Sequence, residues 1–162
     1  MSCFQTLLSI STRGTTPWNE SEPVTAWEGL TFGEAGGADA GRVVGISLVA
    51  KELTDTPAEV GGLTALRWLN LNHNRLTSLP AALGGLTALK SLNLKKNRLS
   101  SLPAALGGLT ALTALDLGGN RLRSVPAELG GLTALTALDL GGNHLRSVPA
   151  ELGVGRCRLT PG

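Results

Sequence analysis

Leucine occupies most apolar positions of residues 63–154, where it recurs at the same places in a unit of 23 residues. Copies of this unit begin at Leu63, Leu86, Leu109 and Leu132, and each copy also carries an Asn, a Pro and a Gly at equivalent positions. A fixed period in the twenties is typical of a solenoid, in which each coil buries its apolar side against its neighbours. The pattern therefore predicts stacked coils and a function that depends on the surface they display.

Apolar and polar residues alternate over a short stretch within each unit. In the first copy, Leu69 and Leu71 alternate with Trp68, Asn70 and Asn72. A two-residue period places the leucines on the inner side of a strand and the other three side chains on its outer side. Because the coils stack, these strands are expected to lie side by side in a parallel sheet.

The second half of each unit predicts a turn and a short segment on the opposite side of the coil. An Asn follows each strand, where its side chain can bond turn backbone that the sheet leaves unpaired. These residues are Asn74, Asn97, Asn120 and Asn143. A Pro then suits the start of a short helical or irregular segment. The glycines after Leu83, Leu106 and Leu129 are expected to end that segment and return the chain to the next strand.

The full pattern is Leu-x-x-Leu-x-x-Leu-x-Leu-x-x-Asn-x-Leu-x-x-Leu/Val-Pro-x-x-Leu-Gly, and it resembles the leucine-rich repeat family. The length of 23 residues is similar to the typical subclass of intracellular scaffolds and departs from the longer plant extracellular form. The resemblance implies an α/β leucine-rich repeat solenoid, with a short curved parallel sheet on the concave face and short helical or irregular convex segments. It also implies a non-catalytic module that binds another protein.

Four segments are expected along the chain. Residues 1–39 form an N-terminal cap, 40–62 a degenerate capping repeat, 63–154 the four regular repeats, and 155–162 a short C-terminal tail. The degenerate repeat keeps the apolar positions, but Lys51 stands where the turn Asn belongs. Terminal repeats are commonly atypical because one side of them faces solvent.

The N-terminal segment resembles the cap of plant-type leucine-rich repeat proteins. It contains Trp18-Asn19, then Trp27-Glu28-Gly29-Leu30, then Gly41-Arg42-Val43, in the order of that cap. The resemblance implies that Trp18 and Trp27 pack over the open end of the sheet. The cysteines that flank the second motif in the family are missing here, so an extracellular setting is not indicated.

Cysteine usage and hydropathy favour an intracellular, cytoplasmic protein. Cys3 and Cys157 lie at opposite ends of the solenoid, about 20 Å apart by strand spacing, which is too far for a disulfide. The first ten residues make a poor signal peptide, and no apolar run is long enough to span a membrane. Residues 1–59 hold three basic and eight acidic side chains, and residues 60–162 hold eleven and four, an asymmetry that we interpret as solubilising.

The C-terminal tail is expected to cover little of the last coil. The strand around Leu138–Leu140 would then leave an unpaired edge and exposed apolar surface. Such an edge can pair with a second copy, so we predict a homodimer through the C-terminal coil.

The candidate binding site lies on the outer positions of the strands. Bulky and charged side chains gather in the coils that begin at Leu63 and Leu86, whereas the last two coils are nearly bare. Trp offers a stacking face, Asn and His offer hydrogen bonds, and two lysines attract carboxylate, sulfate or phosphate. The predicted ligand-binding set is Trp68, Asn70, Asn72, His73, Asn93, Lys95, Lys96, Asp116 and Asp139. A protein or peptide partner fits this set, an anionic glycan is the alternative, and an ordinary solvated face is the simplest interpretation.

Catalysis, metal binding and nucleic-acid binding are not expected. His73 and His144 lie roughly 14 Å apart by strand spacing, too far for a shared metal or a common base role. No zinc, phosphate-loop or nucleophile motif is present, so no cofactor and no metal are predicted. Arg75, Arg98 and Arg121 recur once per coil and could follow a phosphate backbone, but with one aromatic residue nearby the row is better interpreted as solvated.

Overall fold

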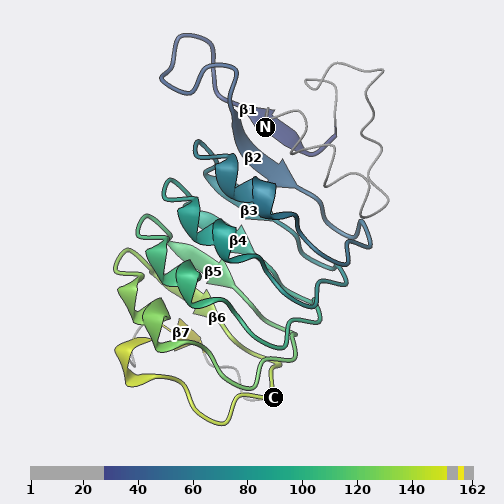
Figure 1. Cartoon of the computed structure of the whole chain (residues 1–162), viewed down its shortest axis with the longest axis vertical. Helices are drawn as coiled ribbons and strands as arrows, with labels where there is room; N and C mark the ends of the chain where they lie inside the picture. Colours follow the sequence, from purple (N-terminus) through teal and green to yellow (C-terminus); the bar gives the residue numbers. More distant parts are fainter. Residues whose placement is uncertain (1–27, 153–156, 159–162) are drawn as a thin grey trace.

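The computed structural model describes residues 28–152 and 157–158, which form a stack of coils with one sheet along one side (Figure 1). The strands are β1 (Leu30–Phe32), β2 (Val43–Ser47), β3 (Trp68–Asn70), β4 (Ser91–Asn93), β5 (Ala114–Asp116), β6 (Ala137–Asp139) and β7 (Cys157–Arg158). They lie in this order in the sheet, with β2 to β7 parallel and β1 antiparallel to β2. The predicted parallel-sheet solenoid is confirmed, and β1 is an addition from outside the repeats.

The opposite side of each coil is a short 3-10 helix that begins directly after a proline. These helices are η2 (Ala58–Gly62), η3 (Ala81–Gly85), η4 (Ala104–Gly108), η5 (Ala127–Gly131) and η6 (Ala150–Leu152). In η3, Pro80 is the N-cap with φ −70° and ψ 141°, an extended conformation that proline adopts readily. The expected convex segments are therefore helical, in the tighter form that suits single turns.

The paired glycines of the convex segments have a second role besides the one expected. Gly84 and Gly85 are the last two residues of η3, which ends at Gly85. A Cβ atom at Gly84 would lie 2.2 Å from the carbonyl oxygen of Ala105, on the next coil. Gly61 and Gly107 face their next coils in the same way, at 2.3 and 2.2 Å. Glycine is required here because the backbones of successive coils approach closely.

One ladder of aliphatic side chains fills the interior from coil to coil. Leu66, Leu89 and Leu112 are fully buried, as are the inward leucines of the strands. The segment before the regular repeats joins the same core, because Ile46, Leu48, Leu53 and Val60 are 0–1% exposed. β2 also pairs with β3 in the register that β3 keeps with β4. Residues 43–62 therefore form a coil of the same kind.

The turn asparagines tie each coil to the one before it. Asn97 donates from Nδ2 to the carbonyl oxygens of Leu71 (2.9 Å) and Leu94 (3.0 Å), and its Oδ1 accepts from the Leu76 N–H at 3.0 Å. Two of these three partners, Leu71 and Leu76, belong to the preceding coil. The side chain is 7% exposed, so these bonds are shielded from water.

The same geometry explains why Lys51 can replace the turn Asn of its coil. Asn74 accepts hydrogen bonds at Oδ1 from the N–H groups of Lys51 and Leu53, and it donates to the Leu48 carbonyl at 2.7 Å. The turn around Lys51 is thus satisfied by the asparagine of the following coil.

The C-terminal edge of the sheet differs from the expectation. β6 is not left unpaired along Leu138–Asp139, because β7 adds a parallel strand with Leu138 opposite Cys157 and Asp139 opposite Arg158. The proposed positions of Cys3, Trp18 and Trp27 lie outside the described residues. In the part of the chain that is described, no helix is long and apolar enough to cross a membrane.

Candidate functional site

The outer side chains of the strands stand in straight columns across the sheet. Strand pairing sets Trp68 opposite Ser91, Ser91 opposite Ala114, and Ala114 opposite Ala137. A second column contains Ser47, Asn70, Asn93, Asp116 and Asp139. Both columns follow directly from the repeat length, because equivalent residues of successive coils are hydrogen-bonded neighbours.

Trp68 lies at the N-terminal end of the concave face and is 39% exposed. Its indole covers Gly45 of β2, where a Cβ atom would come within 2.0 Å of the indole Cε2. The ring therefore leans toward the first coil and away from β4. Part of its surface packs on backbone, and the remainder is available to a ligand.

Lys95 joins the two aspartates of the second column. Its Nζ lies 3.8 Å from Oδ2 of Asp116 and 3.7 Å from Oδ2 of Asp139. The other carboxylate oxygens accept backbone N–H groups, from Gly118 at 3.0 Å and from Gly141 at 2.8 Å. The expected lysine and the expected aspartates therefore form one network with two negative charges and one positive.

Lys95 can reach both aspartates because the next coils are bare beside it. Gly118 and Gly141 follow Lys95 in its column, and a Cβ atom at Gly118 would lie 3.1 Å from the Asp139 carboxylate. With the lysine 40% exposed and the aspartates about one-third exposed, solvent screens the pairs. The network orients these groups more than it stabilises the fold.

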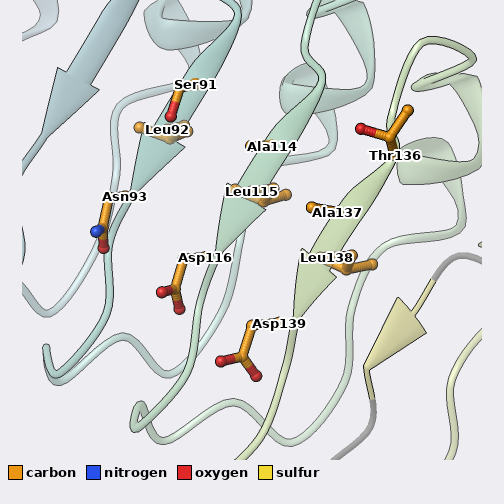
Figure 2. A pocket seen from close by; sticks show the side chains of 10 residues that line it. All are labelled: Ser91, Leu92, Asn93, Ala114, Leu115, Asp116, Thr136, Ala137, Leu138 and Asp139. Atoms are coloured by element: carbon orange, nitrogen blue, oxygen red, sulfur yellow. The ribbon is translucent and has the colours of Figure 1, made fainter.

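A hollow of about 310 Å³ lies on the concave face over β4, β5 and β6 (Figure 2). Small outward side chains, Ser91, Ala114 and Ala137, line one part of it. Figure 2 shows Asn93, Asp116 and Asp139 in a row at the other end of the same strands. Its lining is completed by Leu92, Leu115, Leu138 and Thr136.

The structure divides the predicted site residues between two places. Asn93, Asp116 and Asp139 line the hollow, and Lys95 contacts the two aspartates. The others lie outside its lining: Trp68, Asn70, Asn72, His73 and Lys96. Within that group, Asn70 caps the backbone by accepting the Asn72 N–H at 3.1 Å.

His73 and Lys96 hold a strained backbone conformation. Their φ angles are 56° and 51°, in the left-handed region, and both side chains are exposed. The equivalent positions of the last two coils are Gly119 and Gly142, with φ 66° and 64°. Glycine adopts this conformation freely, whereas a residue with a Cβ is destabilised in it.

Sequence reasoning missed the lining residues Ser91, Ala114, Thr136 and Ala137. Ala114, Thr136 and Ala137 lie in the last two coils, where the concave face carries few functional groups. The signal in the sequence was a series of small side chains at equivalent outward positions of adjacent strands, because small side chains leave an open space above the sheet.

The chain belongs to the leucine-rich repeat family: the sequence model of the leucine-rich repeat region matches residues 41–154. Repeats of this family are generally non-catalytic and serve as protein-interaction modules. No protein of curated function matches the chain in sequence.

Solved structures share this fold. The leucine-rich repeat ectodomain of the receptor kinase SOBIR1 from Arabidopsis thaliana is 24% identical, with a TM-score of 0.77 over 96% of this chain and 88% of that one. A chain of the BIR3–SERK2 complex from Arabidopsis thaliana is 26% identical, with a TM-score of 0.75 over 98% and 92%. A plant ice-binding protein is 27% identical, with a TM-score of 0.78 over 97% of this chain and 55% of that one.

Proposed function

We propose that this module binds a protein or peptide partner through its concave face, with the hollow over β4–β6 as the centre of contact. The observation that supports this proposal most is the hollow itself, about 310 Å³ beside the Lys95–Asp116–Asp139 network. This volume lies at the small end of ligand pockets, which run from about 300 to 1,000 Å³. It suits one or two side chains of a partner better than a separate small molecule. One structural relative is itself part of a complex between two proteins, BIR3 and SERK2.

The chemistry of the hollow favours a neutral or cationic side chain. Two carboxylates face one ammonium group there, which leaves an excess of negative charge. The methyl groups of Ala114 and Ala137 offer an apolar surface to the stem of a lysine or arginine, whose charged end can then reach the carboxylates. A partner loop with one basic side chain is therefore the occupant that we propose.

Filling the hollow tests this proposal. Peptides selected on the wild-type protein from a displayed random library are compared on Ala137→Arg, which places a long side chain in the hollow. Ala104→Arg is the matched control, because Ala104 is exposed on η4 and the chemical change is the same. We expect at least a tenfold loss of affinity for Ala137→Arg and less than a twofold change for Ala104→Arg. Equal retention by both variants would show that the selected peptides bind elsewhere.

An anionic glycan at the Trp68–Lys96 patch is the second proposal. Trp68 offers part of its indole face and Lys96 is exposed, but Lys95 faces two carboxylates. The triple variant Trp68→Ala, Lys95→Ala, Lys96→Ala is expected to abolish glycan binding, which Ala137→Arg should leave intact. Binding of this kind weakens steeply between low and physiological salt. A glycan bound equally well by the triple variant would exclude the patch.

The homodimer and the intracellular location stay proposals. Leu145 and Val148 of the last coil are only partly buried, which favours self-association there, although β7 narrows the free edge of β6. Light scattering that gives the monomer mass over a wide concentration range would refute the dimer. Fractionation of source cells would test the location.

A further inference from the structure

Four arginines and a histidine lie on one flank of the solenoid, between the turn asparagines and the convex helices. We call this surface the arginine flank; it consists of Arg98, Arg121, Arg123, His144 and Arg146. All five side chains are exposed. The flank is separate from the concave hollow, whose lining includes none of these residues.

Backbone hydrogen bonds hold the flank in register. The N–H groups of Arg98, Arg121 and His144 donate to the Leu76, Leu99 and Leu122 carbonyls of the preceding coils, each at 2.9 Å. Residues linked in this manner repeat at about 4.8 Å, as in a sheet. Arg123 and Arg146 add a second column two positions further along, beyond buried Leu122 and half-buried Leu145. The result is a regular array of cations on a rigid backbone.

The arginines of the flank differ from those of the first coils in their pairing. Arg42 and Arg67 both bind Asp39, at 3.2 and 2.7 Å, and Arg75 binds Glu52 at 2.7 Å. Among residues 28–152, no ion pair engages Arg98, Arg121, Arg123 or Arg146. The flank therefore presents charges that no acidic side chain of residues 28–152 neutralises.

The composition of the flank indicates what kind of anion it fits. Arginine has a planar fork that binds sulfate-like and carboxylate groups through two parallel hydrogen bonds, which lysine cannot do. Single-stranded nucleic acids need aromatic platforms for their bases. The described aromatic residues, Phe32 and Trp68, lie in β1 and β3 at the other end of the molecule. A chain of oxyanions without bases matches the array better than a nucleic acid does.

We propose that the arginine flank binds a linear sulfated polysaccharide, with successive sulfate and carboxylate groups meeting arginines of successive coils. This binding is independent of the concave hollow, because it uses a different surface and the opposite charge. A single molecule could hold both ligands at once.

Heparin is the probe for this proposal, titrated into the full chain at several salt concentrations. The test variant is Arg123→Thr, Arg146→Thr, which introduces the residue that Thr77 already provides at the equivalent position. The control, Arg42→Gln, Arg67→Gln, removes the same charge from two arginines that both pair with Asp39. We expect the affinity to fall at least tenfold in the test variant and less than twofold in the control. Equal losses in the two variants would show that binding depends on net charge alone and would overturn the proposal. A wild-type protein that does not bind heparin would overturn it too.

A gain of binding completes the experiment, because misfolding cannot produce it. Thr77→Arg, Ser100→Arg extends the second arginine column into the two preceding coils, and both positions are exposed. This variant should bind heparin at least threefold more tightly than the wild type. Unchanged affinity would contradict the proposal that the arginine columns bind heparin. A parallel titration with a thymidine oligonucleotide separates the ligand classes. Oligonucleotide binding as tight as heparin binding, and lost in the same test variant, would overturn the assignment to a polysaccharide.

Discussion

The asparagine ladder makes a quantitative prediction, since a single substitution removes bonds that join two coils. Asn97→Ala deletes the acceptor of the Leu76 N–H group and the donor to the Leu71 and Leu94 carbonyls. The site is buried, so water does not readily replace the lost partners.

The magnitude follows from what each group keeps. The Leu76 N–H loses its acceptor, which costs about 1–3 kcal/mol for a buried donor. The Leu71 carbonyl still accepts from Asn74, and the Leu94 carbonyl still accepts from Asn120. Each of these carbonyls therefore loses one bond of two, worth about 0.5–1.5 kcal/mol. Together the losses are about 2–6 kcal/mol, a large share of the roughly 5–15 kcal/mol that stabilises a domain.

Urea unfolding followed by circular dichroism measures this loss directly. Asn93→Ala is the matched control: its Oδ1 accepts the Lys95 N–H, at 3.0 Å, on the half-exposed concave face. Water can replace that bond, so we expect a loss below about 1 kcal/mol. A change of less than about 1 kcal/mol in Asn97→Ala, or equal changes in both variants, would refute the account of the ladder. The slope of the transition shows whether the comparison remains valid, because altered cooperativity would change it.

Two further substitutions test the backbone. Gly84→Ala should destabilise the protein by at least about 2 kcal/mol, since the new Cβ would lie 2.2 Å from the Ala105 carbonyl oxygen. Gly85→Ala, in which the new Cβ would lie 3.6 Å from its nearest neighbour, should be neutral or stabilising by up to about 1 kcal/mol. Equal melting temperatures for the two variants would contradict the close approach of the coils at Gly84. Lys96→Gly should raise the stability by about 0.5–1 kcal/mol, because the left-handed φ of 51° is relieved at the expense of a more flexible unfolded chain. The reverse change, Gly119→Lys, should lower it, and a melting temperature that rises instead would be incompatible with backbone strain.

The repeat pattern predicted most of the fold because the 23-residue repeat and the two-residue alternation within it determine how the strands are arranged. The 23-residue spacing determines which residues are neighbours across coils, and the alternation around Leu69 and Leu71 determines which face is outward. The columns of the concave sheet could therefore be written from the sequence. β1 and β7 could not, because each is a short strand from outside the repeats and its pairing depends on the path of a connection.

The candidate site was harder to predict because it depends on how far the Lys95 side chain extends and on the space above small side chains. Lys95 lies across bare Gly118 to contact Asp116 and Asp139, and the length of a flexible side chain has no sequence period. The hollow arises where Ala114 and Ala137 are small, whereas a search for functional groups selects large and charged residues. The pairing of Arg42 and Arg67 with Asp39 was likewise hidden, since Asp39 lies outside the repeats.

Amide chemical-shift mapping of the isotopically labelled protein, titrated with a peptide selected on the wild type, tests the central proposal most directly. If the concave hollow is the centre of contact, the largest shifts fall on the amides of β4, β5 and β6, around Ser91, Ala114 and Ala137. Shifts concentrated on the convex helices η3–η5, with these strands unchanged, would contradict the proposed function.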